Sequence, residues 1–358
     1  MNFPEWARKM FSEAMNKLVK VYSVFHPSNL KERGIKYTVI AFFALYAVII
    51  TALIFIWDTE PELFDVKEEA KNHIVAGSTT EVVGYVYTAT LVRIGETLLD
   101  KRGGYISNDI TPPGIFMDNM PNWEFGALVI LRDSTGALRN HFSRSQSQSV
   151  ENIELSRAEP QLNFQNDSWI LPATESEYRE GIELIKTYSQ QLVNNSSNAQ
   201  FFARADNLVK YLDIVEKRLG SLSQRLSASV GQVRVNTDLA GDSAAKQSNQ
   251  SGNNVVVKTP WIDIDDIFYE SRGACWALYH VLKAVEHDFD SILRKKNALI
   301  SLRQILRELE ATQETTFSPM VMNGSGFGLT SNYSLIMANY IARANAAIID
   351  LRSLLENG

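Results

Sequence analysis

The residue types best suited to hold a ligand gather in a polar loop at residues 107–123. Its candidates are Asn108, Asp109, Asp118, Asn119 and Trp123. Amides and carboxylates form directional hydrogen bonds and an aromatic face adds apolar contact, so this mixture suits a sugar or a peptide. The same residue types are also common in loops that are fixed by Asx turns and a buried tryptophan. The sequence leaves both interpretations open.

A second polar group consists of Asp263, Asp265, Asp266 and Glu270. Carboxylates this close together can bind Ca²⁺ or Mg²⁺, but the glycine and glutamate positions of an EF-hand are missing. Acidic residues also favour the first turn of a helix, where they meet the positive end of the helix dipole. We therefore predict a helix start, with no metal site and no cofactor.

Familiar catalytic motifs are absent from the sequence. Its five histidines form no HExxH pattern, and no GxSxG elbow nominates a serine. Cys275 falls on the apolar face of a predicted helix and suits a small core residue. The glycine-rich stretch 323–328 lacks the phosphate-loop pattern and suits a turn between helices. The sequence thus nominates no catalytic residue and favours a protein without catalytic activity.

Composition excludes several classes of protein. Apolar residues make up 45% of the 358 residues and charged residues 21%, which is typical of a folded chain. A single cysteine excludes an internal disulfide and a cysteine-based zinc or iron–sulfur site. The net charge of −6 argues against nucleic acid as a partner.

One segment predicts a membrane span. The 21 residues from Tyr37 to Trp57 carry no charge and begin and end with an aromatic residue. At about 1.5 Å per residue they cover a hydrocarbon core of about 30 Å, and both aromatic rings suit the membrane–water interface. The run starts too late and is too long for a cleaved signal peptide. We predict an uncleaved transmembrane helix at 37–57 that makes the lipid bilayer a partner.

Charge predicts the orientation of this span. Residues 1–36 hold seven Lys and Arg against three acidic residues, whereas no basic residue precedes Lys67 on the other side. The positive-inside rule then places the N-terminus in the cytoplasm and residues 58–358 outside it. The arm at 1–36 has a basic amphipathic pattern, with Trp6 as a third interfacial aromatic. A partner protein could cover this arm instead of lipid.

Helical patterns dominate the remainder. We predict a linker at 58–80, then an α-helical domain at 81–358 with a flexible loop at 236–254. Apolar residues between 201 and 226 repeat every 3.5 residues, which is typical of a helix–helix seam. Residues 261–310 predict one long helix, although a break near His287 and Asp288 stays open. Residues 125–131 fit a helix or a strand equally well. The expected fold is mainly α: one N-terminal transmembrane helix and a bundle of long helices.

Several stretches carry a family resemblance. They are TLVRIGETLLDKRGGYISNDITPPGIFMDNMPNWEFG (90–126), FSRSQSQS (142–149), RLGSLSQRLSASVGQ (218–232) and NGSGFG (323–328). Together they resemble an uncharacterised family of proteobacterial inner-membrane proteins, a DUF2333-like domain of unknown function with one N-terminal span. The resemblance implies a bacterial inner-membrane location and a periplasmic C-terminal domain. It implies no activity and no site residues.

Three functions follow as hypotheses. The first is an envelope scaffold whose helical domain binds a partner protein or a second copy of the chain. The second is a binder or hydrolase of a peptidoglycan-like envelope component, acting through loop 107–123. The third is a sensor, which would need a cytoplasmic partner because only about 36 residues remain on that side. The anchor, the helix seam and the missing catalytic motifs favour the first.

Overall fold

The computed structural model describes residues 27–72, 82–144, 151–195, 199–235, 254–315, 321 and 333–357. The chain divides into two compact units, Met1–Trp57 and Asp58–Gly358, which are described separately. Three sequence predictions fall on residues outside these ranges. They concern most of the N-terminal arm with Trp6, the loop at 236–253 and the glycine-rich stretch 323–328.

The first unit contains helix α2 (Pro27–Trp57), which is interrupted by Gly34 at a φ of 74°. Its Tyr37–Trp57 segment has a mean hydropathy of 2.9 and is long and apolar enough to cross a membrane. The exposed side chain of Phe55 illustrates that these apolar groups are not covered by protein. Such a helix is compatible with a single-pass membrane anchor, because lipid would remove its apolar surface from water.

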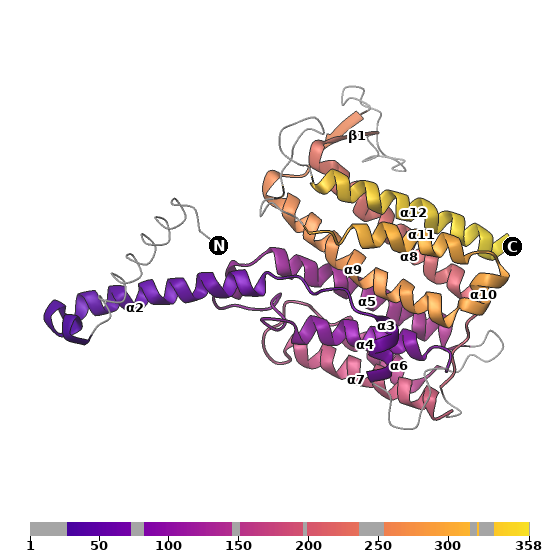
Figure 1. Cartoon of the computed structure of the whole chain (residues 1–358), viewed down its shortest axis with the longest axis horizontal. Coiled ribbons are helices and arrows are strands. Elements are labelled where there is room, and N and C mark those ends of the chain that lie inside the picture. Colours follow the sequence, from indigo (N-terminus) through magenta and orange to yellow (C-terminus); the bar gives the residue numbers. More distant parts are fainter. Residues whose placement is uncertain are drawn as a thin grey trace, which may run out of the picture. The chain divides into compact units, whose positions relative to one another are not determined.

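The second unit is mainly α, as the sequence predicts (Figure 1). Its helices and strands are α3 (Val66–Asn72), α4 (Tyr85–Asp100), η1 (Gly114–Phe116), α5 (Asn119–Ala137), η2 (Leu138–Phe142), α6 (Ile153–Leu162), α7 (Thr174–Val193), α8 (Ala205–Ser227), η3 (Ala228–Val230), β1 (Gln232–Val235), β2 (Asn254–Val257), η4 (Trp261–Asp263), α9 (Ile264–Asp288), α10 (Asp290–Lys295), α11 (Leu299–Ala311) and α12 (Tyr333–Asn357). The two strands form one antiparallel ribbon in which Gln232 faces Val257. Residues 125–131 are therefore helical, as part of α5.

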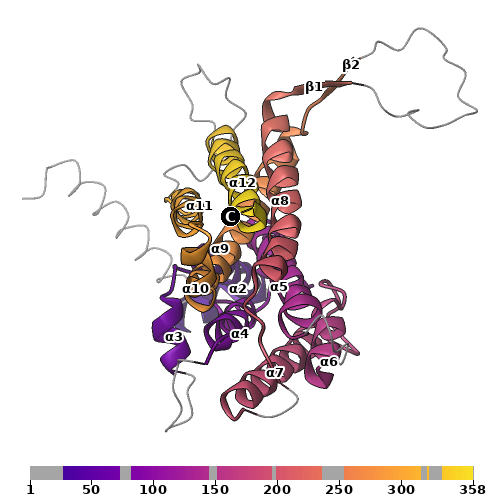
Figure 2. The ribbon, with the colours of Figure 1, turned by 90° about the vertical axis from the view of Figure 1, so that its right-hand side faces the viewer.

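The apolar 3.5-residue repeat of α8 packs against another helix of the same domain. Its leucines, among them Leu212 and Leu219, are buried, and α8 packs along α12 (Figures 1 and 2). Of the small residues of α12, Ala338 and Ala344 are buried, whereas Ala342 and Ala346 are exposed. A regular apolar stripe on one helix and short side chains on the other allow the close helix contact that the sequence predicts.

Helices α5 and α9 cross with their backbones nearly touching. A Cβ atom at Gly126 would lie 1.9 Å from the carbonyl oxygen of Glu270, and one at Gly273 would lie 1.9 Å from that of Trp123. No side chain fits at such distances, so each helix contributes a glycine to the crossing. Beside it the indole rings of Trp123 and Trp276 pack with centroids 5.1 Å apart.

Residues 261–310 do not form the single long helix predicted, and the chain breaks at Asp288, where the sequence left a break open. Helix α9 ends at Asp288, α10 is short, and α11 returns to pack against α9. Asn297 adopts a left-handed φ of 53°, and the N–H of Ala298 donates to the carbonyl of Leu293 at 2.8 Å. Asparagine tolerates this conformation better than most residues, and that allows the reversal without a glycine or a proline.

Substituting the two crossing glycines tests how much the fold depends on this contact. We expect Gly126→Ala and Gly273→Ala each to lower the free energy of unfolding by more than about 2 kcal/mol, because the helices must separate. Gly220→Ala is the control, because its Cβ would meet only the Asn345 side chain at 3.6 Å. That change should alter stability by no more than about 1 kcal/mol. Unfolding of the full chain in detergent, followed by circular dichroism, measures all three; equal effects would contradict the expectation.

Candidate functional site

An extended segment, Asp58–Asp65, lies along helix α9; we call it the strap. Alternate strap residues meet every fourth residue of the helix. The Glu60 carboxylate accepts three hydrogen bonds from Arg272, at 2.7 and 2.9 Å from Nε and at 2.5 Å from Nη2. The indole N–H of Trp276 donates to the Glu62 carbonyl at 3.2 Å. Four helical residues rise about 6 Å and two extended residues span about 6.6 Å, so the two repeats stay in step.

The third contact of this series joins Phe64 to His280, whose imidazole is buried and uncharged. The Phe64 N–H donates to Nε2 of His280 at 3.0 Å, and Nδ1 of His280 lies 2.7 Å from the Trp276 carbonyl. One nitrogen must accept and the other donate, so the imidazole holds a single proton, on Nδ1. The Phe64 ring also stacks on the imidazole with centroids 3.8 Å apart. Burial lowers the pKa of His280 to about 3.

Arg272 extends the attachment of the strap to the end of α11. Its Nη1 donates to the carbonyls of Thr312 and Glu314 at 2.9 and 3.0 Å. Only 7% of the Arg272 side chain and 19% of that of Glu60 are exposed. A guanidinium so withdrawn from water needs all of these acceptors, since an unpaired buried charge is costly. The strap is therefore an integral part of the domain.

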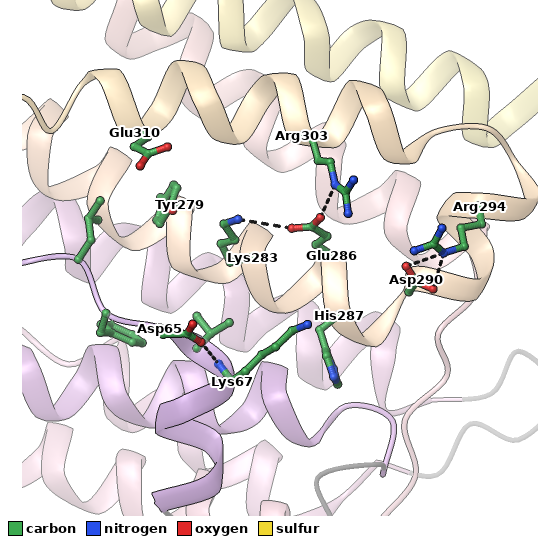
Figure 3. A pocket seen from close by; sticks show the side chains of 13 residues that line it. Asp65, Lys67, Tyr279, Lys283, Glu286, His287, Asp290, Arg294, Arg303 and Glu310 are labelled. Atoms are coloured by element: carbon green, nitrogen blue, oxygen red, sulfur yellow. Dashed lines mark hydrogen bonds and ion pairs between the residues drawn. The ribbon is translucent and has the colours of Figure 1, made fainter.

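Beside the strap lies a groove of about 790 Å³ bounded by the strap, the start of α3, and helices α9, α10 and α11 (Figure 3). We call it the charged groove. Its lining residues are Leu63, Phe64, Asp65, Val66, Lys67, Tyr279, Lys283, Glu286, His287, Asp290, Arg294, Arg303 and Glu310. Four of them are cationic and four are acidic, so the two signs balance. Figure 3 shows Lys67 reaching from the start of α3 toward Glu286 and His287.

Ion pairs tie part of this lining together. Glu286 forms ion pairs with Arg303 at 2.6 Å and with Lys283 at 3.6 Å (Figure 3). Arg294 forms an ion pair with Asp290 at 2.8 Å. The arginines of these pairs are more than half exposed. Exposed pairs contribute little to stability, so they can exchange partners at low cost. The groove therefore offers both signs of charge to a ligand that carries both.

One pair of residues in this region has the geometry of an oriented base. Nδ1 of His287 lies 3.1 Å from Oδ1 of Asp288, and Oδ2 of Asp288 accepts from the Tyr87 N–H at 2.8 Å. The Asp288 side chain is buried and that of His287 is 30% exposed. A fixed carboxylate that holds the Nδ1 proton leaves Nε2 as the basic nitrogen. The described lining contains no Ser, Thr or Cys, so this base would have to act on water or on the ligand.

A second groove, of about 500 Å³, lies on the α4 side of the strap. Its lining residues are Thr59, Glu60, Pro61, Glu62, Arg93, Glu96, Thr97, Asp100, Lys101 and Arg102. Charged side chains predominate here too. Both grooves share the strap as a wall, so any change in the strap would alter both.

The loop predicted to bind a ligand contributes to neither groove. Asn108 is buried and donates to the Ser168 carbonyl at 2.9 Å and to Glu175 at 2.7 Å. Trp123 is fully buried. The pKa of the half-buried Asp109 is raised by burial and by nearby carboxylates. The structure uses Asn108 and Trp123 internally, and ligand binding by this loop stays a prediction.

Asp118 and Asn119 lie instead at a join between the strap and two helix starts. Asp118 is exposed and accepts from the Asn119 N–H at 2.9 Å, where α5 begins. The Asn119 amide donates to Asp58 at 3.3 Å. Asp266 in α9 accepts from the Asn122 amide at 2.7 Å. The hydrogen bonds of this join bring together parts of the chain that are far apart in sequence.

Acidic residues crowd together at this join, and the pKa of Asp266 is raised there. Partial burial and the neighbouring carboxylates of Asp265 and Asp118 raise the pKa of Asp266 to about 6. Glu270, from the same sequence cluster, is held by Arg225 through two contacts of 2.6 Å. Within the described part of the chain, no group of three or more His, Cys, Asp or Glu is arranged to hold a metal ion.

Sequence reasoning missed the strap and the charged groove. Residues 58–80 show a linker composition, although Asp58–Asp65 is docked and α3 follows directly. The spacing of Arg272, Trp276 and His280 by four residues was the available signal, because it sets polar groups on one face of an apolar helix. The groove also needs the turn at Asn297, which the sequence does not mark.

Together the fold and site define a class: a mainly α protein with one N-terminal helix apolar enough to cross a membrane, whose helical domain docks the segment that follows. The chain belongs to a bacterial family described as uncharacterised protein conserved in bacteria (DUF2333), whose model matches residues 30–358. This match confirms the resemblance found in the sequence. Comparison with curated proteins and with solved structures gives no match.

Removing the titration of His280 tests the strap contact. The folded chain keeps this imidazole neutral down to about pH 3, whereas the unfolded chain protonates it near pH 6.5. Stability should therefore fall as the pH drops from 6.5 towards 3, by up to about 1.4 kcal/mol per unit. His280→Gln retains an acceptor for Phe64 but does not titrate, so its stability should depend less on pH in this range. Identical pH profiles from chemical unfolding would contradict the assignment.

Asp266 should act in the opposite direction. Its pKa is raised in the folded state, so its contribution to stability is present below the unfolded value near 4 and is lost as the pH rises through about 6. Asp266→Asn keeps the oxygen that accepts from Asn122 and removes the charge. We expect it to stabilise the protein at pH 7.5 by about 1 kcal/mol, after discounting for solvent screening, and to have no such effect at pH 4. Urea unfolding at the two pH values compares it with the unaltered chain.

Proposed function

We propose that this protein is a single-pass anchor of the bacterial inner membrane whose helical domain serves as a scaffold in the periplasm. In this proposal the N-terminus lies in the cytoplasm, Tyr37–Trp57 crosses the bilayer, and Tyr37 and Trp57 lie at its two surfaces. The observation that carries the proposal is the strap. Its attachment through Arg272, Trp276 and His280 begins directly after the span and leaves no free linker there. The segment that follows the span is therefore part of the folded domain, which supports a scaffold role.

The chemistry of the charged groove supports a polypeptide as its occupant. Pockets for small molecules are mostly apolar with a few polar groups, whereas eight of this groove's lining residues are charged. Charges of both signs give specificity for a partner with complementary charges. An extended peptide with alternating acidic and basic residues meets that pattern. We therefore propose that the scaffold binds its protein partner at the charged groove.

A second candidate function is the binding or hydrolysis of a peptidoglycan-like envelope component. The observation that favours it is the oriented pair of His287 and Asp288 at the groove, which could take a proton from water. Peptide stems with both amino and carboxylate groups would also suit the balanced charge. In this version the residues of loop 107–123 could contribute a separate contact surface.

Reporter fusions test the proposed orientation. Alkaline phosphatase fused after Gly358 should be active and a green fluorescent protein at the same position dark, because the first folds outside the cytoplasm. A truncation fused after Lys36 should give the reverse result. An inactive phosphatase and a fluorescent green fluorescent protein at the C-terminus would contradict the periplasmic location.

Site-specific photocrosslinking in cells tests the groove. A photoreactive residue in place of Tyr279 should yield a discrete protein adduct, and one in place of Ile300, which is exposed but outside the lining, should not. Lys67→Glu combined with Lys283→Glu should abolish the adduct by reversing part of the charge. An adduct that lysozyme digestion removes would favour the second function, and equal adducts at both positions would contradict a specific groove.

A further inference from the structure

Three turns of the helical domain expose large apolar side chains. We call them the apolar turns: Ile115 and Phe116 in the first, Trp169, Ile170 and Leu171 in the second, and Trp261 and Ile262 in the third. The side chain of Leu171 is 90% exposed and that of Ile262 is 73% exposed. Single exposed apolar residues are ordinary, but groups of them at one place mark an interaction surface.

Hydrogen bonds place these turns at one end of the domain. Asn108 donates to the Ser168 carbonyl and the Tyr105 hydroxyl to that of Asn166, which joins the first two turns. The hydrogen bond from Asn122 to Asp266 joins the start of α5 to that of α9, next to the third turn. The hydrogen bond from Asn108 to Glu175 brings the start of α7 to the same end.

The first turn is built on a rigid support. The Glu124 side chain is fully buried and accepts from the N–H groups of Ile106 and Ser107 at 2.9 and 2.8 Å. Lys101, also buried, pairs with the same carboxylate and donates to the Gly104 carbonyl. The part of the loop that precedes Ile115 and Phe116 is thus held rigidly by buried contacts. The exposure of these two side chains therefore belongs to the folded structure of the domain.

The same end of the domain holds the residue that follows the membrane span. Asp58 is joined by one peptide bond to Trp57, and its carboxylate accepts from Asn119, four residues after Ile115. Consecutive Cα atoms are about 3.8 Å apart, so a span that ends at Trp57 brings the bilayer surface to this end. Lipid is thus the apolar medium nearest to the apolar turns.

We propose that the apolar turns insert into the leaflet from which the chain emerges at Trp57, and so form a second contact with the membrane. This inference rests on the proposed membrane anchor. Tryptophan, phenylalanine and leucine side chains partition favourably into the interface, to a depth of about 5–10 Å. The polar backbone of the turns prevents deeper entry.

Charge selects the lipid that these turns contact. Asp118, Asp263, Asp265 and Asp266 lie beside the turns, and their carboxylates repel one another. Anionic headgroups would add to this repulsion, whereas zwitterionic headgroups would not. The turns therefore insert into zwitterionic lipid and less readily into a strongly anionic surface.

Fluorescent labels on the full chain in phosphatidylcholine nanodiscs test the proposal. Single cysteines replace Phe116, Leu171, Val48 in the span or Ile300 on α11, while the native Cys275 is buried and escapes labelling. Lipids that carry a quencher should reduce the fluorescence at positions 48, 116 and 171 but not at 300. Exchange of half the lipid for phosphatidylglycerol should weaken the quenching at 116 and 171 and leave that at 48 unchanged.

The outcomes separate this inference from the anchor itself. Quenching at 48 without quenching at 116 and 171 would overturn the insertion of the turns and leave the anchor intact. Quenching at none of the four positions would overturn both. Leu171→Asp should also reduce the quenching of a label at 116. The new charge disfavours insertion of the second turn, and the first turn, which is joined to it, should leave the lipid as well. An unchanged signal would count against joint insertion.

Discussion

The contact of α5 with α9 is the constraint on which the rest of the domain depends. Gly126 and Gly273 allow the two backbones to meet, and the ring of Trp123 packs on that of Trp276 beside them. This fixes α9 about its own axis. One of its faces then presents Arg272 and His280 to the strap, while another directs Lys283 and Glu286 into the charged groove. A helix rotated by a single residue would turn by about 100° and lose both sets of contacts.

Matching repeats explain why the strap docks on this helix. An extended chain and a helix meet at regular intervals when two residues of one span nearly the same length as four residues of the other. The contacts at Glu60, Glu62 and Phe64 use this match, and each satisfies a buried polar group of α9 or of the strap itself. The strap thereby forms one wall of each of the two grooves. In the sequence it directly follows the apolar helix.

Much of the fold could be predicted because it rests on local patterns. The uncharged run at 37–57, the 3.5-residue repeat of α8 and the mainly α class can each be read from neighbouring residues. The reversal of the chain at Asn297 could not be predicted, because Asn297 carries a weak signal and the tertiary contact of α11 with α9 stabilises the turn. The candidate site was missed for a related reason: its two sides come from residues 63–67 and 279–310, and no local pattern links them.

The sequence by itself determined the apolar helix, the helical class and the family, since periodicity and composition depend only on the order of residues along the chain. Only the tertiary structure decided which polar residues are available for function. Asn108 and Trp123 are used in internal contacts, whereas Lys67, Glu286 and His287 meet at one groove. The physical reason is that burial and hydrogen bonding are settled when distant segments pack together, and identical side chains become structural or free to bind according to that packing.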